Sequence, residues 1–176
     1  PGVYELISGQ ATCEQVVQGT QVPGLEVVAS SISLAGAAVE LVGRREREFF
    51  LDRALRGYDE DYDFVFIDCP PSLGILTVNG LTAATSVIIP LQCEYFALEG
   101  LSELLKTIET IRAGFNPSLR LGGILFTMFD ARTRLSQEVV KEVSGFFREK
   151  VFRTVIPRNV RLSEAPSHAK PIQLYD

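Results

Sequence analysis

A carboxylate directly follows an apolar run near the middle of the chain. Residues 64–67 read Phe-Val-Phe-Ile, which is typical of a strand buried on both faces, and Asp68 comes next. Pro70 and Pro71 then end the run, because proline lacks the N–H that a strand requires. An acid at the carboxyl end of a buried strand lies where open α/β sheets bind their ligands. Asp68 is therefore our first candidate site residue, and an aspartate that merely caps a strand-to-helix turn is the alternative.

The order of the expected elements predicts the fold class. We expect strands at 25–29, 64–67, 86–91, 121–127 and 151–156, the third of them halted by Pro90. We expect helices at 3–8, 34–57 with a break near Gly43, 75–84, 97–112, about 135–147, and from 160 onward. Strands that alternate with helices predict an α/β protein with a doubly wound, mostly parallel sheet. The 176 residues are enough for one domain, residues 1–176.

Composition excludes several classes of protein. Apolar residues make up 46% and charged residues 22%, which is ordinary for a globular protein. No apolar run approaches the roughly 20 residues that span a bilayer. The cysteines are three in number and lack C-x-x-C spacing, so we expect free, packing thiols and a reducing cytoplasm rather than disulfides or zinc.

Four longer segments carry a more specific pattern. They are residues 68–74 (DCPPSLG), 90–100 (PLQCEYFALEG), 127–133 (TMFDART) and 155–168 (VIPRNVRLSEAPSH). Together they resemble the ParA/Soj family of chromosome- and plasmid-partition ATPases. The family opens with a two-lysine, deviant Walker A phosphate loop and ends with a further helix, whereas no G-x-x-x-x-G-K-[ST] string occurs here. We therefore expect a P-loop NTPase-like fold that is incomplete at both ends.

The resemblance implies ATP and Mg²⁺ as cofactors and ATP hydrolysis as the activity of the intact protein. Asp68 then corresponds to the Walker B aspartate, a catalytic residue that holds Mg²⁺ through water, and Pro70 and Pro71 correspond to the switch that senses the γ-phosphate. A rigid turn is the alternative for the two prolines. Because the phosphate loop supplies most of the phosphate-binding N–H groups, we expect the 176-residue chain alone to be inactive and to bind ATP weakly or not at all.

The resemblance places the adenine at the carboxyl ends of two later strands, at Thr127, Met128, Pro157, Arg158 and Asn159. Met128 and Pro157 have side chains that suit the apolar face of a base. Asn159 or nearby backbone suits its polar edge. The alternative for Asn159 is that it caps the helix that follows.

Positive charge gathers in one segment although the net charge is −5. Residues 131–170 carry nine Lys or Arg and four Asp or Glu. Residues 1–130 carry eight Lys or Arg and 17 Asp or Glu. Arg132 and Arg161 match positions that contribute to non-specific DNA binding in the family. Arginines in loops contact phosphates without reading bases. Solvated surface arginines with no such role are the alternative.

The resemblance also implies partners. We expect an ATP-dependent homodimer that binds DNA non-specifically, a ParB-like partner that stimulates hydrolysis, a cytoplasmic, nucleoid-associated location, and no membrane binding.

Three other functions are alternatives. A MinD-type cell-division ATPase is one, and it needs a basic amphipathic C-terminal helix. An iron–sulfur relative is another, but Cys69 and Cys93 lack the flanking glycines of cluster ligands. A non-catalytic interaction domain is the third alternative. The string PRNVRLSEAP at 157–166 favours the partition branch.

Overall fold

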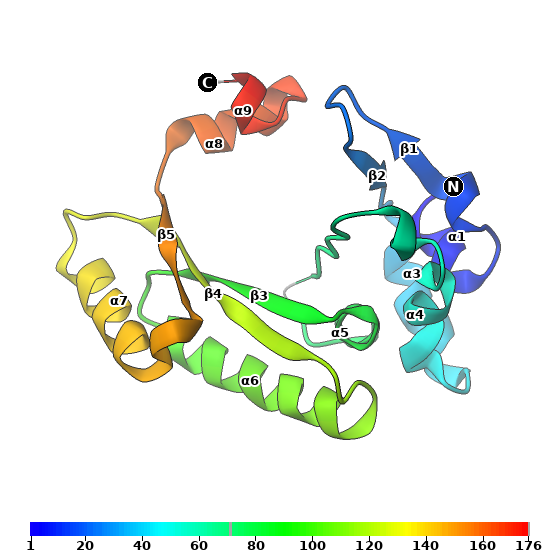
Figure 1. Ribbon diagram of the computed structural model, residues 1–176, viewed down its shortest axis with the longest axis horizontal. Coiled ribbons are helices and arrows are strands. Elements are labelled where there is room, and N and C mark those ends of the chain that lie inside the picture. Colours follow the sequence, from blue (N-terminus) through cyan, green and yellow to red (C-terminus); the bar gives the residue numbers. More distant parts are fainter. Residues whose placement is uncertain (71, 176) are drawn as a thin grey trace. The chain divides into compact units, whose positions relative to one another are not determined.

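The computed structural model describes residues 1–70 and 72–175, in which the chain forms two compact units (Figure 1). Unit 1 comprises residues 1–85 and 106–120, and unit 2 comprises residues 86–105 and 121–175. Helix α6 (Ala97–Gly114) belongs partly to each unit.

Unit 1 is mainly helical. Its helices are α1 (Val3–Ser8), α2 (Cys13–Val16), α3 (Ser33–Glu40), α4 (Phe50–Leu55) and α5 (Ile75–Ala83), with short 3-10 turns at Leu41–Gly43, Arg47–Phe49 and Asp59–Asp61. Strands β1 (Val17–Gly19) and β2 (Glu26–Val28) pair antiparallel. Gly9 ends α1 with a φ of 78°, a conformation that only glycine adopts without strain. The break predicted near Gly43 is confirmed as the turns between α3 and α4.

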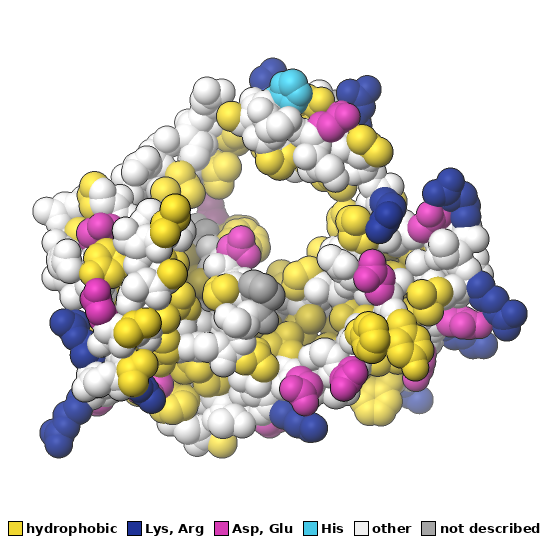
Figure 2. Space-filling model, turned by 180° about the vertical axis from the view of Figure 1, so that it is seen from behind, with side chains coloured by type: hydrophobic (Ala, Val, Ile, Leu, Met, Phe, Trp, Pro, Cys, Tyr) yellow, Lys and Arg dark blue, Asp and Glu magenta, His cyan; other side chains and the backbone are white. Residues whose placement is uncertain are grey.

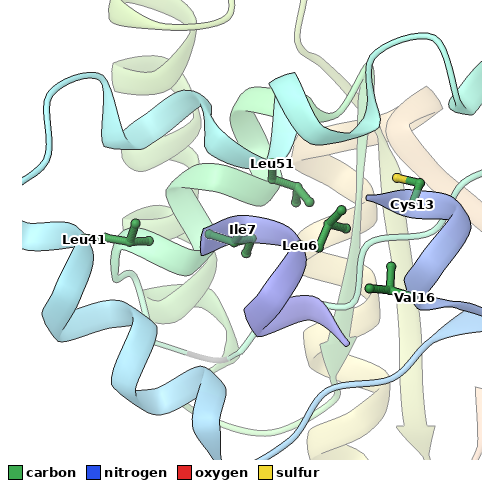
Figure 3. Packing of buried hydrophobic residues seen from close by; sticks show 6 residues of the cluster. All are labelled: Leu6, Ile7, Cys13, Val16, Leu41 and Leu51. Atoms are coloured by element: carbon green, nitrogen blue, oxygen red, sulfur yellow. The ribbon is translucent and has the colours of Figure 1, made fainter. Parts of the chain in front are cut away.

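The core of unit 1 is a cluster of small and medium apolar side chains from α1, α2, α4 and the turn after α3 (Figure 3). Its buried members are Leu6, Ile7, Cys13, Val16, Leu41 and Leu51. Ile67 and Ile75 pack against this cluster and are partly buried. Burial of these side chains holds the segment before Asp68 and the start of α5 against one core.

Two buried amides complete the packing around α5. Asn79 is fully buried, and its Oδ1 accepts from the Leu51 N–H at 3.1 Å. Asn116 caps the far end of the helix, because its Nδ2 donates to carbonyl oxygens that the helix leaves without partners. These acceptors are Leu81 at 3.1 Å, Thr82 at 3.0 Å and Ala84 at 2.7 Å.

Unit 2 is built on a three-stranded sheet in the order β3-β4-β5. Its strands are β3 (Ser86–Gln92), β4 (Arg120–Phe129) and β5 (Val151–Pro157), and its other helices are α7 (Arg134–Phe147), α8 (Val160–Glu164) and α9 (Ile172–Tyr175), with 3-10 turns at Arg148–Lys150 and Ala165–His168. Strands β4 and β5 run parallel. The predicted α/β class with a parallel sheet is therefore confirmed, and the helix at 97–112 extends to Gly114 as α6.

Two predictions about strands were wrong. Pro90 does not halt β3, which continues to Gln92, because β3 is an edge strand of this sheet and an edge position does not need every N–H. Residues 64–67 form no strand, and the Phe64 and Phe66 side chains are 79% and 82% exposed. An apolar run becomes a buried strand only beside partner strands, and none of the described strands pairs with it.

Hydrophobic side chains also remain visible among charged ones on the surface in Figure 2. Ile32, Val39 and Val42, in and around α3, are the most exposed aliphatic side chains of unit 1. Within residues 1–70 and 72–175, no helix has both the length and the apolar character that crossing a membrane requires.

Candidate functional site

The segment that carries Asp68 lies closely against α5. A Cβ placed on Gly80 would lie 2.6 Å from Cys69 Sγ and 3.3 Å from Ile67 Cγ2. The first distance is shorter than real carbon–sulfur contacts, so only a glycine at position 80 lets the two segments approach this closely. Gly80 thus sets the path of the backbone on both sides of Asp68.

Thr77 holds the next part of the segment. Its side chain is buried, and Oγ1 donates to the Ser72 carbonyl oxygen at 2.6 Å and lies 3.3 Å from that of Pro70. A helix side chain that bonds the loop before its own first turn fixes the entry of that helix. The first of the two predicted switch prolines is therefore tied to α5, while Pro71 lies outside the described residues.

Asp68 itself is exposed, and within the described residues its carboxylate makes no hydrogen bond and no ion pair. Burial, and to a smaller degree the nearby Asp68 charge, raise the pKa of the Cys69 thiol above its ordinary value. Within the described residues, no group of three or more His, Cys, Asp or Glu lies close enough together to hold a metal ion. One accessible carboxylate suits Mg²⁺, which proteins often hold by one or two carboxylates together with water and substrate phosphates.

The residues predicted to contact adenine meet in unit 2, at the carboxyl ends of β4 and β5. Phe129 lies opposite Pro157 in the parallel register, and the Arg158 N–H donates to the Phe129 carbonyl oxygen at 3.0 Å. Thr127 is half-buried, and its carbonyl oxygen accepts from the Cys93 N–H at 3.4 Å. The structure thus brings the two halves of this predicted site together, although their contact with a base remains a prediction.

A bulge interrupts the regular pairing of β4 with β5 near the end of β4. The register with β5 shifts between Phe126 and Phe129, and Met128 in between has a φ of 53°. A non-glycine residue in the left-handed region costs on the order of 1–3 kcal/mol, and such strain gathers at functional sites. The Met128 side chain is 39% exposed here. Sequence reasoning missed the bulge because no glycine or asparagine marks it.

Asn159 acts as the N-cap of α8. Its Oδ1 accepts from the Arg161 N–H at 2.8 Å, so the capping alternative raised from the sequence describes the contact that is present. The side-chain amide nitrogen is on the other side of the same group and is a donor only. If Asn159 also contacts adenine, its amide nitrogen donates to a ring nitrogen of the base.

Each of the two predicted DNA-binding arginines lies beside an acid of its own unit. Arg132 Nε and Nη2 donate to the two oxygens of Asp130, at 2.9 Å and 2.7 Å. Arg161 Nη1 lies 3.9 Å from Glu164, and its guanidinium carbon lies 5.9 Å from the centre of the Tyr175 ring. The first pair is bidentate and the second is loose. Sequence reasoning identified the arginines but neither acid partner.

Comparison with known proteins decides the family. The AAA domain family matches residues 1–121. The chromosome-partitioning ATPase Soj of Treponema pallidum is 56% identical over 174 residues, which are 99% of this chain and 69% of the relative. The sporulation initiation inhibitor protein Soj of Bacillus subtilis is 53% identical over the same shares of both chains. The chain belongs to the Soj/ParA family of chromosome-partitioning ATPases. It spans 62% of the length of the Myxococcus xanthus partitioning protein ParA, at 52% identity.

Solved structures support the same assignment. A cobyrinic acid a,c-diamide synthase from Mycobacterium smegmatis, with bound ATP analogue and magnesium, is 42% identical with a TM-score of 0.83, over 91% of this chain and 65% of that one. Apo McdA from Cyanothece is 16% identical with a TM-score of 0.88, over 99% of this chain and 71% of that one, which shows the fold alone. The prediction of a nucleotide-binding P-loop ATPase fold is therefore confirmed, as are ATP and Mg²⁺ as the cofactors of the family.

Proposed function

We propose that the full-length gene product is an ATP-dependent DNA-partition ATPase and that residues 1–176 belong to its single ATPase domain. The observation that carries the proposal is the exposed carboxylate of Asp68 on a backbone fixed by Gly80 and Thr77. An acid with this accessibility is suited to a ligand that arrives from solvent. The family membership of the chain supports Mg·ATP as that ligand.

Asp68 would hold Mg²⁺ through a water molecule, and the ion would supply positive charge for the phosphates of the nucleotide. Positioning is the larger part of catalysis in phosphoryl transfer, because the transferred group needs little covalent help. The contacts of Thr77 and Gly80 with the Asp68 segment provide such positioning. Pro70 and Pro71 would form the switch, and the contact of the Pro70 carbonyl with Thr77 would change with the γ-phosphate.

The nucleoside would lie at the ends of β4 and β5. Met128 and Pro157 are both exposed there and suit the faces of an adenine ring. Asn159 would donate to the edge of the base, and Thr127 and Arg158 would contribute backbone groups beside it. Strain at Met128 supports this position for a ligand, because non-glycine residues in the left-handed region gather at functional sites.

The remaining features proposed are those of the partition cycle. ATP would join two copies into a dimer, and Arg132 and Arg161 would bind DNA phosphates without sequence preference in the cytoplasm, on the nucleoid. A ParB-like partner would stimulate hydrolysis and reset the dimer. A MinD-type membrane cycle is the other candidate, and the chromosome-partitioning names of the relatives support partition over it.

The experiment is a paired measurement on the full-length gene product. We expect slow Mg²⁺-dependent ATP hydrolysis, together with retention of unrelated DNA duplexes that requires ATP and falls with added salt. A lipid-vesicle arm distinguishes the two candidates. ATP-dependent binding to anionic vesicles but not to DNA would replace partition with the membrane cycle.

A further inference from the structure

The loop after β4 places a carboxylate on the arginine that is proposed to bind DNA. Asp130 Oδ1 accepts from both the backbone N–H and Nε of Arg132, at 3.0 Å and 2.9 Å, and Oδ2 accepts from Nη2 at 2.7 Å. The carboxylate therefore occupies the Nε and Nη2 edge of the guanidinium. That edge is one of those that a phosphate takes in a bidentate contact.

The acid is the more buried member of this pair and the arginine is the more exposed one. The Asp130 side chain is 21% exposed, whereas that of Arg132 is 86% exposed. The Asp130 carbonyl oxygen accepts from the N–H and the hydroxyl of Thr133, both at 3.1 Å, and Thr133 is the N-cap of α7. The turn thus anchors Asp130 to a helix, while the guanidinium extends into solvent.

The charges around the pair favour an ionised acid. Arg132 holds the pKa of the Asp130 carboxyl well below its usual range, mainly through the side-chain hydrogen bonds, and the charge of Arg158 adds a smaller effect in the same direction. The carboxylate accordingly stays charged at neutral pH. A phosphate that approaches Arg132 meets an anion already bound to it.

We propose that Asp130 competes with DNA phosphates for Arg132 and so weakens the affinity of this loop for DNA. The inference rests on the proposed role of Arg132 in DNA binding. A phosphate gains the guanidinium only by displacing the carboxylate. The displaced carboxylate then lies next to the phosphate and repels it. Both effects lower affinity, and neither depends on the base sequence.

The test is Asp130→Asn in the full-length gene product. Asparagine keeps a side-chain oxygen for the Arg132 N–H, so the turn is retained while the charge is removed. With ATP present, we expect binding to each of two unrelated duplexes to tighten by roughly two- to fivefold, the range for loss of an exposed ion pair. The slope of log affinity against log salt should steepen by up to about one unit, because Arg132 then neutralises a phosphate fully.

Two controls make the test specific. Glu142→Gln removes one exposed acid from α7 in the same basic segment without touching Arg132, and it should raise affinity less than Asp130→Asn does. Adding Arg132→Ala to Asp130→Asn should abolish the gain. A wild-type affinity for Asp130→Asn, or a gain that survives Arg132→Ala, would overturn the competition while leaving the partition function in place. A wild-type protein without any salt-dependent DNA binding would overturn both.

Discussion

Asp68 and Arg132 are held in opposite ways. At Asp68 the backbone is fixed, by the close approach to Gly80 and the hydrogen bond from Thr77, and the side chain is exposed without a partner among the described residues. At Arg132 the side chain itself is bound, by both oxygens of Asp130. The first arrangement leaves a charge available to a ligand, whereas the second requires the ligand to replace a partner.

The difference bears on the strength and the reversibility of binding. A carboxylate with no protein partner loses only hydration when it receives a hydrated ion. Packing against α5 already orders the backbone that carries it, so binding costs little further conformational entropy. A paired guanidinium exchanges one anion for another, so the net gain is small. The comparison predicts strong dependence of function on the Asp68 charge and modest, adjustable dependence on the acids around the arginines.

The largest expected effect is at Asp68. In the full-length gene product, Asp68→Asn should lower the rate of ATP hydrolysis by roughly 10- to 100-fold, because the loss of an outer-shell group that orients metal-bound water has an effect of about that size. Steady-state phosphate release measures it. Asp63→Asn is the matched control, since it removes an exposed carboxylate five residues earlier in the same segment. Equal turnover in the two variants would remove Asp68 from the active site.

A second prediction concerns the backbone that positions Asp68. Gly80→Ala puts a Cβ 2.6 Å from Cys69 Sγ, and such overpacking lowers the free energy of unfolding by about 1–3 kcal/mol. Urea denaturation measures the change. Gly36→Ala in α3 meets nothing within 4 Å and should instead stabilise by about 0.5–1 kcal/mol. If Gly80→Ala behaves like Gly36→Ala, the close approach is not a constraint on this segment.

The hydrogen bond from Thr77 should have a smaller effect. Thr77→Val keeps the shape of the side chain but removes the donor to Ser72, at a cost of about 1 kcal/mol in the free energy of unfolding. ATP hydrolysis should fall by more than that loss of folded protein explains, because the switch is then held less firmly. Hydrolysis that follows the folded fraction alone, in parallel melts and rate measurements, would limit Thr77 to a structural role.

The smallest expected effect is at Glu164. Its 3.9 Å contact with Arg161 is too long for a hydrogen bond, so Glu164→Gln should raise DNA affinity by less than Asp130→Asn, at most roughly twofold. The same salt series compares the two variants. A larger gain from Glu164→Gln would reverse the order and show that proximity in the structure does not set the competition.

Helices were the most predictable part of this fold, because apolar spacing fixes which face is buried. Leu101, Ile108 and Ile111 of α6 are buried as their spacing predicts. The run at 64–67 was misassigned because strand formation depends on partners that a local pattern does not contain. Likewise, the left-handed Met128 results from the register of β4 with β5 and not from its own side chain.

In the candidate site, too, the sequence predicted residue types and order but not the contacts that depend on the folded structure. The resemblance named Asp68, Met128, Asn159 and both arginines as site residues, and their contacts with ligands stay predictions. It did not reveal the Asp130 partner of Arg132, since the spacing of an acid and an arginine in a loop does not fix whether their side chains pair. Asn159 was predicted both as a helix cap and as a base contact. The cap is present, because it needs only the neighbouring Arg161 N–H, whereas the base contact stays a prediction.

The packing of Cys69 against Gly80 gives the protein a built-in chemical reporter. Burial raises the pKa of this thiol, so little of it is thiolate at neutral pH and alkylating reagents should modify it slowly. Any event that lifts the Asp68 segment from α5 would hydrate the sulfur and speed the labelling. Cys13 and Cys93 are buried in other places and provide internal references. The time course of labelling by mass spectrometry would then follow the movement of this segment without an introduced cysteine.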